Sequence, residues 1–152
     1  MDTPIKTSNF VEHQLDPKLR VAVPTDWRPP EGIPLRLRYV DEDGIPMIRA
    51  YFEASYQRKL AEIEGHERFE KRPAERDKVR RFFKRSCHKV VINTQGKLTV
   101  PPALAKAAEF SIPGKICLEF SEDDSIDLYT PENHTRMTEM LNAELTEFSD
   151  LL

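Results

Sequence analysis

Alternating apolar and polar residues dominate the start of the chain and predict short β-strands. Residues 10–15, FVEHQL, alternate as a half-buried strand does, and residues 20–24, RVAVP, alternate again before stopping at a proline. Between them, DPKL supplies turn chemistry, because the Asp16 side chain can bond the backbone two residues further on. These residues predict a β-hairpin-like unit.

The pattern then changes period several times. A short helical turn is expected around residues 25–28, followed by a proline-rich corner. Strict alternation in residues 35–39 predicts a strand, and IPMIRAY, residues 45–51, predicts a returning strand after the turn DEDG. Apolar residues at helical spacing predict a helix over about 53–64. After a break at GHERFEKRP, the segment AERDKVRRFFKRS, 74–86, reads as an amphipathic helix.

The remaining chain repeats the first half in pattern. Residues 15–24, LDPKLRVAVP, are answered 77 positions later by residues 92–101, INTQGKLTVP, which keep the same chemistry in the same order. The second half is predicted to contain strand KVVI, turn NTQG, strand KLTVP, helix PALAKAAEF, corner SIPG, strand KICLEF, turn SEDDS, strand IDLY and a helix from about Pro131 to Phe148. Each half is therefore strand, turn, strand, short helix, corner, hairpin and helix.

Units of this size cannot bury their apolar faces alone. We therefore expect an α+β fold in which the two halves pack together about a pseudo-twofold axis. The predicted organisation is a first repeat at residues 8–66, a linking basic helix at 67–86 and a second repeat at 87–148.

Composition indicates a globular protein with uneven charge. The chain has 152 residues, 39% hydrophobic and 32% charged, and a net charge of −3. Between Tyr56 and Lys89 there are 12 basic and six acidic residues, whereas Glu119 to Asp150 holds ten acidic residues and one basic residue. Such asymmetry fits either a nucleic-acid partner or solvated helix faces. The first residues lack the features of a signal peptide and no stretch is long enough to span a membrane, so we expect a cytoplasmic protein without a membrane partner.

Basic and polar residues recur beside both turns. Lys18 and Arg20 lie on one side of the first predicted hairpin, and Gln95 and Lys97 take the matching places in the second. A basic residue just after a tight turn can enter a DNA groove while the turn's N–H groups face phosphates. The sequence therefore predicts DNA contacts at these four residues.

The doubled motif resembles that of the MraZ proteins. EHQLDPKLRVAVPTDWR and NTQGKLTVPPAL are similar to the twice-occurring motif of this family of bacterial regulators of the division and cell-wall gene cluster, within the AbrB-like swapped-hairpin superfamily. The resemblance implies a swapped-hairpin β-barrel with peripheral helices, ring-shaped homo-oligomers, and binding to short direct repeats in promoter DNA. Carried onto this chain, the first motif is Asp16 and Arg20, and the second is Asn93 and Lys97.

The chain departs from the family pattern at three positions. Asn93 replaces the family's Asp, Lys97 replaces its Arg, and Leu19 stands where the family usually has Gly, while Gly96 is kept. Lysine lacks arginine's bidentate fork, so we expect the first repeat to specify sequence and the second to position the protein on phosphate. Because φ above zero is costly for leucine, the first turn is expected to differ in shape from the second.

Other readings remain beside DNA binding. His13, Cys87 and His88 could suggest a metal site or a Cys-His nucleophile, but neither has its partner motif, so no metal, cofactor or catalytic residue is assigned. Both cysteines are expected to be reduced core thiols. Trp27 is expected to plug the core as Leu104 does in the second half, and the pair Phe82 and Phe83 is expected in the core or at a subunit contact.

The resulting hypothesis is a non-enzymatic, sequence-specific transcriptional regulator, a repressor by expectation, which acts over the nucleoid without a small-molecule substrate. Two alternatives differ in class. One is a ring-forming interaction scaffold whose altered motifs no longer read DNA. The other is an antitoxin-like swapped-hairpin protein whose acidic C-terminal helix masks a toxin.

Overall fold

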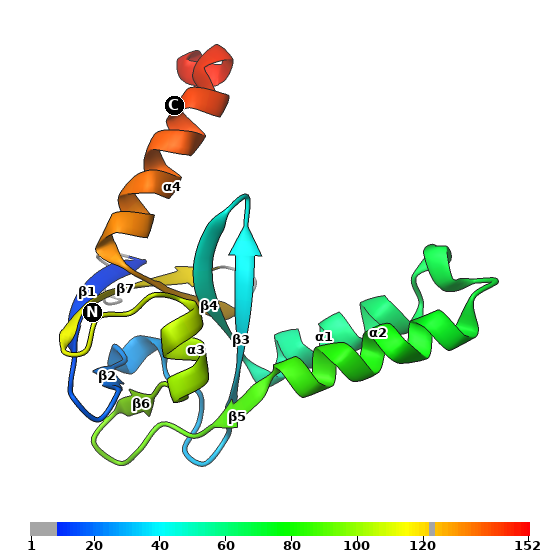
Figure 1. Ribbon diagram of the computed structural model, residues 1–152, viewed down its shortest axis with the longest axis horizontal. Helices are drawn as coiled ribbons and strands as arrows, with labels where there is room; N and C mark the ends of the chain where they lie inside the picture. Colours follow the sequence, from blue (N-terminus) through cyan, green and yellow to red (C-terminus); the bar gives the residue numbers. More distant parts are fainter. Residues whose placement is uncertain (1–8, 122–123) are drawn as a thin grey trace, which may run out of the picture.

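A computed structural model describes residues 9–121 and 124–152 of the chain (Figure 1). The elements, in chain order, are β1 (Phe10–Leu15), β2 (Arg20–Ala22), η1 (Thr25–Trp27), β3 (Leu35–Glu42), β4 (Ile45–Tyr51), α1 (Glu53–Glu64), η2 (Glu67–Phe69), α2 (Pro73–Ser86), β5 (His88–Val90), β6 (Lys97–Thr99), α3 (Pro102–Ala107), β7 (Gly114–Ser121), β8 (Ser125–Tyr129), α4 (Pro131–Glu144) and η3 (Thr146–Leu151). The fold is α+β with antiparallel strands, as predicted.

The strands of the two halves are interleaved. The larger sheet has the order β1-β7-β8-β4-β3-β5, and a separate two-stranded ribbon is formed by β2 and β6. When each strand is matched to its counterpart in the other repeat, this order is the same read from either edge. In the middle of the ribbon, Val21 of β2 opposes Leu98 of β6, and in the middle of the large sheet Arg49 of β4 opposes Asp127 of β8.

Strand pairing differs from the prediction of a local hairpin. β1 pairs with β7 and β2 pairs with β6, so the strands on either side of the first turn each take a partner from the second half. Exchange of this kind lets each half bury apolar faces that a lone two-stranded unit would leave in water. The large sheet is open, with β1 and β5 at its edges, so the expected closed barrel is not confirmed.

The core lies between the sheet, the ribbon and the short helices. Val21, Val23, Leu98 and Val100 are at most 1% exposed, so both motif strands turn this face into the core. Trp27 is also buried, with its ring centroid 5.7 Å from that of Phe120. The remaining members of the main cluster are Leu15, Leu35, Leu37, Ile48, Ala50, Leu104, Ala105, Ala108, Phe110, Ile116, Leu118, Ile126 and Leu128. Trp27 and Leu104 therefore both belong to the core, as expected.

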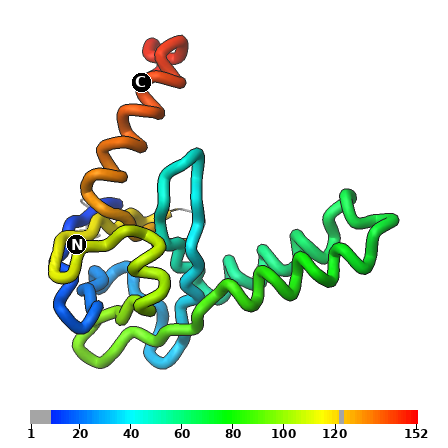
Figure 2. The backbone as a smooth tube through the Cα atoms, in the orientation of Figure 1, coloured from blue at the N-terminus to red at the C-terminus, as the bar shows by residue number. Residues whose placement is uncertain are grey.

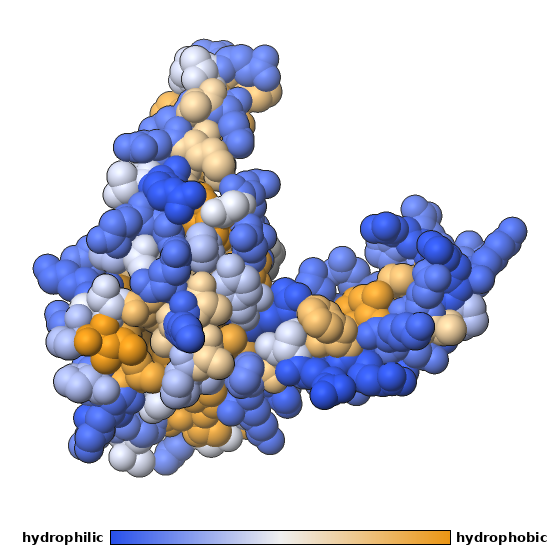
Figure 3. All heavy atoms as spheres, in the orientation of Figure 1, coloured by the Kyte–Doolittle hydropathy of each residue, from blue (hydrophilic) through white to orange (hydrophobic). Residues whose placement is uncertain are grey.

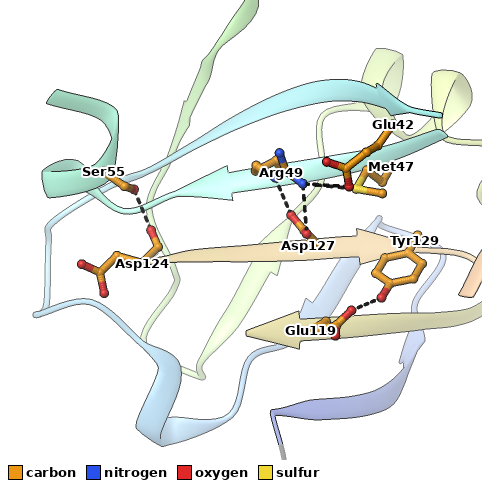
Figure 4. Close-up of polar contacts among 8 residues, drawn as sticks. All are labelled: Glu42, Met47, Arg49, Ser55, Glu119, Asp124, Asp127 and Tyr129. Atoms are coloured by element: carbon orange, nitrogen blue, oxygen red, sulfur yellow. Dashed lines mark hydrogen bonds and ion pairs between the residues drawn. The ribbon is translucent and has the colours of Figure 1, made fainter. Parts of the chain in front are cut away.

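Polar contacts join the halves where β4 meets β8 (Figure 4). Arg49 Nε donates to Asp127 Oδ1 at 2.8 Å, and its Nη2 lies 3.4 Å from Glu42 Oε2. The bond to Asp127 raises the pKa of the arginine, so the pair stays ionised. On the other side of β8, the Tyr129 hydroxyl donates to Glu119 of β7, and burial followed by this bond raises the pKa of the tyrosine.

Two helical arms leave this body in different directions (Figures 1 and 2). The first is the hairpin of α1 and α2, in which Phe83 of α2 packs against Tyr56 of α1 and against Tyr51 of β4, the contact that seats the arm on the sheet. The second is α4 followed by η3, seated by Met137 and Met140 against a small cluster around Tyr129. Within residues 9–121 and 124–152, neither arm nor any other helix is long and apolar enough to cross a membrane.

The two aromatic residues of α2 were predicted in the core or at a subunit contact, and the structure confirms the core position for Phe83. Phe83 is 6% exposed, whereas its neighbour Phe82 is 65% exposed and stands outside the core of the chain. Consecutive residues of a helix are about 100° apart, so one of them faces the body and the other faces away.

Candidate nucleic-acid interface

The first motif is a tight turn closed by Asp16. The backbone N–H groups of Lys18 and Arg20 both donate to Asp16 Oδ1 at 2.9 Å, and Arg20 Nε donates to Oδ2 at 2.8 Å. These bonds, the Arg20 backbone N–H first among them, hold the pKa of the Asp16 carboxyl below its usual value. Within the part of the chain that the structure describes, Nε is the only guanidinium atom of Arg20 that is engaged.

The second motif repeats this geometry with an amide in place of the carboxylate. Asn93 Oδ1 accepts the backbone N–H groups of Gln95 at 3.0 Å and Lys97 at 2.9 Å. The closing backbone bonds also match: Asn93 N–H donates to the Lys97 carbonyl at 2.9 Å, and Gly96 N–H donates to the Asn93 carbonyl at 2.9 Å. A neutral amide cannot hold a cation as Asp16 does, so Lys97 carries its charge without an acidic partner in the motif.

The expected difference in turn shape was wrong. Leu19 has φ of 63° and Gly96 has φ of 78°, so both turns place their fourth residue in the left-handed region. This conformation costs a leucine about 1–2 kcal/mol. The half-buried Leu19 side chain packs against the main core, and burial of that apolar surface offsets the cost.

Pairing of β2 with β6 brings both motifs to one surface. Arg20 opposes Thr99 and Ala22 opposes Lys97, so these four side chains share the outer face of the ribbon. Arg20 and Lys97 are diagonal neighbours there. Each turn is also tied to the other half, because Val23 N–H donates to the Gly96 carbonyl at 3.1 Å and Val100 N–H to the Leu19 carbonyl at 2.8 Å.

Lys18 and Gln95 lie in the turns at opposite ends of the ribbon, and both are exposed. The structure therefore places the four predicted DNA residues on or beside one ribbon. A three-residue ribbon is about 10 Å long, and the major groove admits a two-stranded ribbon. Arrangement and charge are thus compatible with entry into a groove.

No protein-family model matches the chain, and no curated protein is significantly similar to it. The geometry of the two turns is therefore what carries the functional argument.

Arg28 is a further basic residue at this surface that the motif pattern did not point to. Its Nε donates to the Val23 carbonyl at 2.8 Å, and its guanidinium covers Gly96 so closely that a Cβ built on that glycine would overlap it. Arg28 is exposed and follows the first motif, yet it serves the turn of the second. Its position corresponds to Ala105 in the other repeat, so the repeat contained no signal for it.

The cysteines do not form part of this surface. Cys117 is buried and Cys87 half-buried, and burial raises the pKa of each thiol to about 11. Thiols of this kind are protonated at neutral pH and are poor nucleophiles. Among the described residues, no group of three or more His, Cys, Asp or Glu side chains could hold a metal ion.

Proposed function

We propose that the chain is a sequence-specific DNA-binding transcriptional regulator of the MraZ type, acting without catalysis on promoter DNA that carries short direct repeats. The observation that carries this is the pair of matched turns, which present Arg20 and Lys97 on one face of the β2–β6 ribbon. The strand exchange between the halves supports the swapped-hairpin assignment of the fold. In this role the protein would be associated with the nucleoid and act as a repressor.

The two turns differ in what they offer to DNA. Arg20 is anchored through Nε by Asp16, which orients its terminal nitrogens for bidentate contact with a guanine edge. Lys97 is a point charge suited to phosphate. Arg28 supplies a guanidinium beside the second turn, where the motif itself has lysine. The first turn then specifies sequence, and the second positions the protein.

One ribbon is too small to bind DNA strongly, because the Kd for nonspecific binding of this kind is typically about 10⁻⁴ to 10⁻⁶ M at physiological salt. Assembly of several chains into a ring would present several ribbons at once, and linked contacts raise avidity by about 10² to 10⁴. A ring also reconciles DNA binding with the net charge of −3, since only the ribbon face has to be positive.

Fluorescence anisotropy on the DNA upstream of the protein's own gene, against a scrambled duplex and across a salt series, tests this proposal. Arg20→Ala should weaken binding to the native duplex by about 1–3 kcal/mol and should abolish the preference for that duplex. Lys97→Ala should weaken binding by a smaller amount that is equal for both duplexes. It should also reduce by about 1 the slope of the logarithm of the binding constant against the logarithm of the salt concentration. Lys71→Ala, at the tip of the α1–α2 arm, is the matched control and should bind as the wild type does.

Absence of binding to either duplex at physiological salt would reject DNA recognition. It would favour the second candidate, a ring-forming interaction scaffold, for which the exposed apolar residues on both arms provide a specific observation. Equal losses for Arg20→Ala and Lys97→Ala on both duplexes would reject the division of labour between the turns.

A further inference from the structure

We propose that α4 of one chain docks onto α2 of a second copy, in a head-to-tail contact that builds the proposed assembly. Two surfaces take part. The basic face consists of Lys78, Arg81, Phe82 and Arg85 on α2. The acidic face consists of Leu141, Glu144, Leu145 and Phe148 on α4 and η3. This inference rests on the oligomeric part of the proposed function and is independent of DNA binding.

The basic face is an apolar side chain surrounded by unpaired cations. Its residues are spaced i, i+3, i+4 and i+7 and therefore share one side of the helix. Phe82 is 65% exposed at the centre. A hollow of about 420 Å³ is lined by these four residues and Ser86. In the described chain none of the three cations has an acidic partner, in contrast to Arg80, which lies 2.8 Å from Glu64 on α1.

The acidic face has three apolar side chains and one carboxylate, Glu144. Leu141, Leu145 and Phe148 are 44%, 41% and 45% exposed, although they follow the spacing of a packed helix face. The carboxylates along this arm are Glu132, Glu139, Glu144, Glu147 and Asp150, and none forms an ion pair with a described residue. Figure 3 shows apolar atoms running along both arms between hydrophilic ones.

A second copy is the occupant that fits both faces together. Each face has an apolar centre that no described part of the chain covers, and their charges are complementary. The two arms extend from the body in different directions, so α4 does not reach α2 of its own chain (Figures 1 and 2). A contact between these two different faces that is made once per pair of chains is heterologous, and such contacts generate a ring when the rotation closes and a filament when it does not.

Charge reversal tests this contact by sedimentation velocity without DNA. Wild type should sediment as an oligomer. Arg81→Glu with Arg85→Glu, and separately Glu144→Lys with Glu147→Lys, should each fall to the mass of the 17.6 kDa chain. Mixing the two variants should restore an oligomer of alternating chains, because the two unchanged faces match at one contact and the two charge-reversed faces match at the next. Arg68→Glu with Lys71→Glu, at the tip of the α1–α2 arm, is the control and should remain assembled.

Three outcomes would overturn the inference: a monomeric wild type at micromolar concentration, variants that stay assembled, or folded variants whose mixture does not reassemble. Far-UV circular dichroism confirms that each variant is folded. An α2 variant that remains assembled but loses DNA binding would assign the basic face to nucleic acid instead. If assembly behaves as expected while no DNA is bound, the contact stands and the proposed regulator fails.

Discussion

Gly96→Ala should destabilise the protein through two effects that meet at one atom. The new Cβ would occupy a left-handed residue, at φ of 78°, and would also overlap the Arg28 guanidinium. The first effect costs about 1–2 kcal/mol. The second displaces an exposed, flexible side chain and costs chiefly its bond to the Val23 carbonyl, about 0.5–1.5 kcal/mol. The expected loss in unfolding free energy is therefore about 1.5–3.5 kcal/mol.

The two effects can be separated in a double-mutant cycle with Arg28→Ala. Once the guanidinium is absent, Gly96→Ala should cost only the backbone strain, so the double variant should be about 0.5–1.5 kcal/mol more stable than the sum of the single losses predicts. Urea denaturation at one protein concentration measures all four proteins, because assembly would otherwise shift the apparent stability. Strictly additive losses would show that Arg28 does not rest on Gly96, and the role given to Arg28 at the second turn would be withdrawn.

Three further outcomes follow from the same geometry. The pKa of Asp16 is lowered by its bonds, so its contribution to stability is present above the unfolded value of about 3.9 and is lost as the pH falls through the folded value. In NMR the chemical shift of the Arg20 backbone N–H should therefore change as the pH falls below that value. The chemical shift of the Lys97 backbone N–H should stay constant, because its acceptor is the side chain of Asn93, which does not titrate; a parallel change in both would contradict this. Trp27→Ala should cost about 3–5 kcal/mol in urea denaturation, since the side chain is 3% exposed, and a loss under about 1 kcal/mol would reject its place in the core. Cys117, buried with its pKa raised to about 11, should resist iodoacetamide at about pH 8 until the protein is unfolded; rapid labelling of the native protein would count against its burial.

Local patterns predicted the elements well because each strand and helix has its own periodicity. The strand at 45–51 and the helix at 53–64 were predicted with the bounds that the structure has for β4 and α1. The turn chemistry of Asp16 and Asn93 was also visible, since both act on a backbone N–H two residues away. These features are determined by residues that are close together in the sequence.

Tertiary choices were not contained in those patterns. Alternation shows that a strand has a buried face but does not determine which strand pairs with it. β1 and β2 were therefore predicted to pair with each other, whereas each pairs with a strand of the second half. At Leu19 the propensity rule was outweighed by packing of the side chain against the core. Arg28 was missed because its contact with Gly96 joins two repeats, and no single segment encodes it.

Exchange of strands between the halves has a consequence for biosynthesis. β1 ends at Leu15 and its partner β7 begins at Gly114. About 100 further residues must therefore be translated after β1 before the two strands can pair. At about 5–20 residues per second this delay is on the order of 5–20 seconds. During that interval β1 and β2 of the nascent first half lack their partner strands and are accessible to chaperones and proteases.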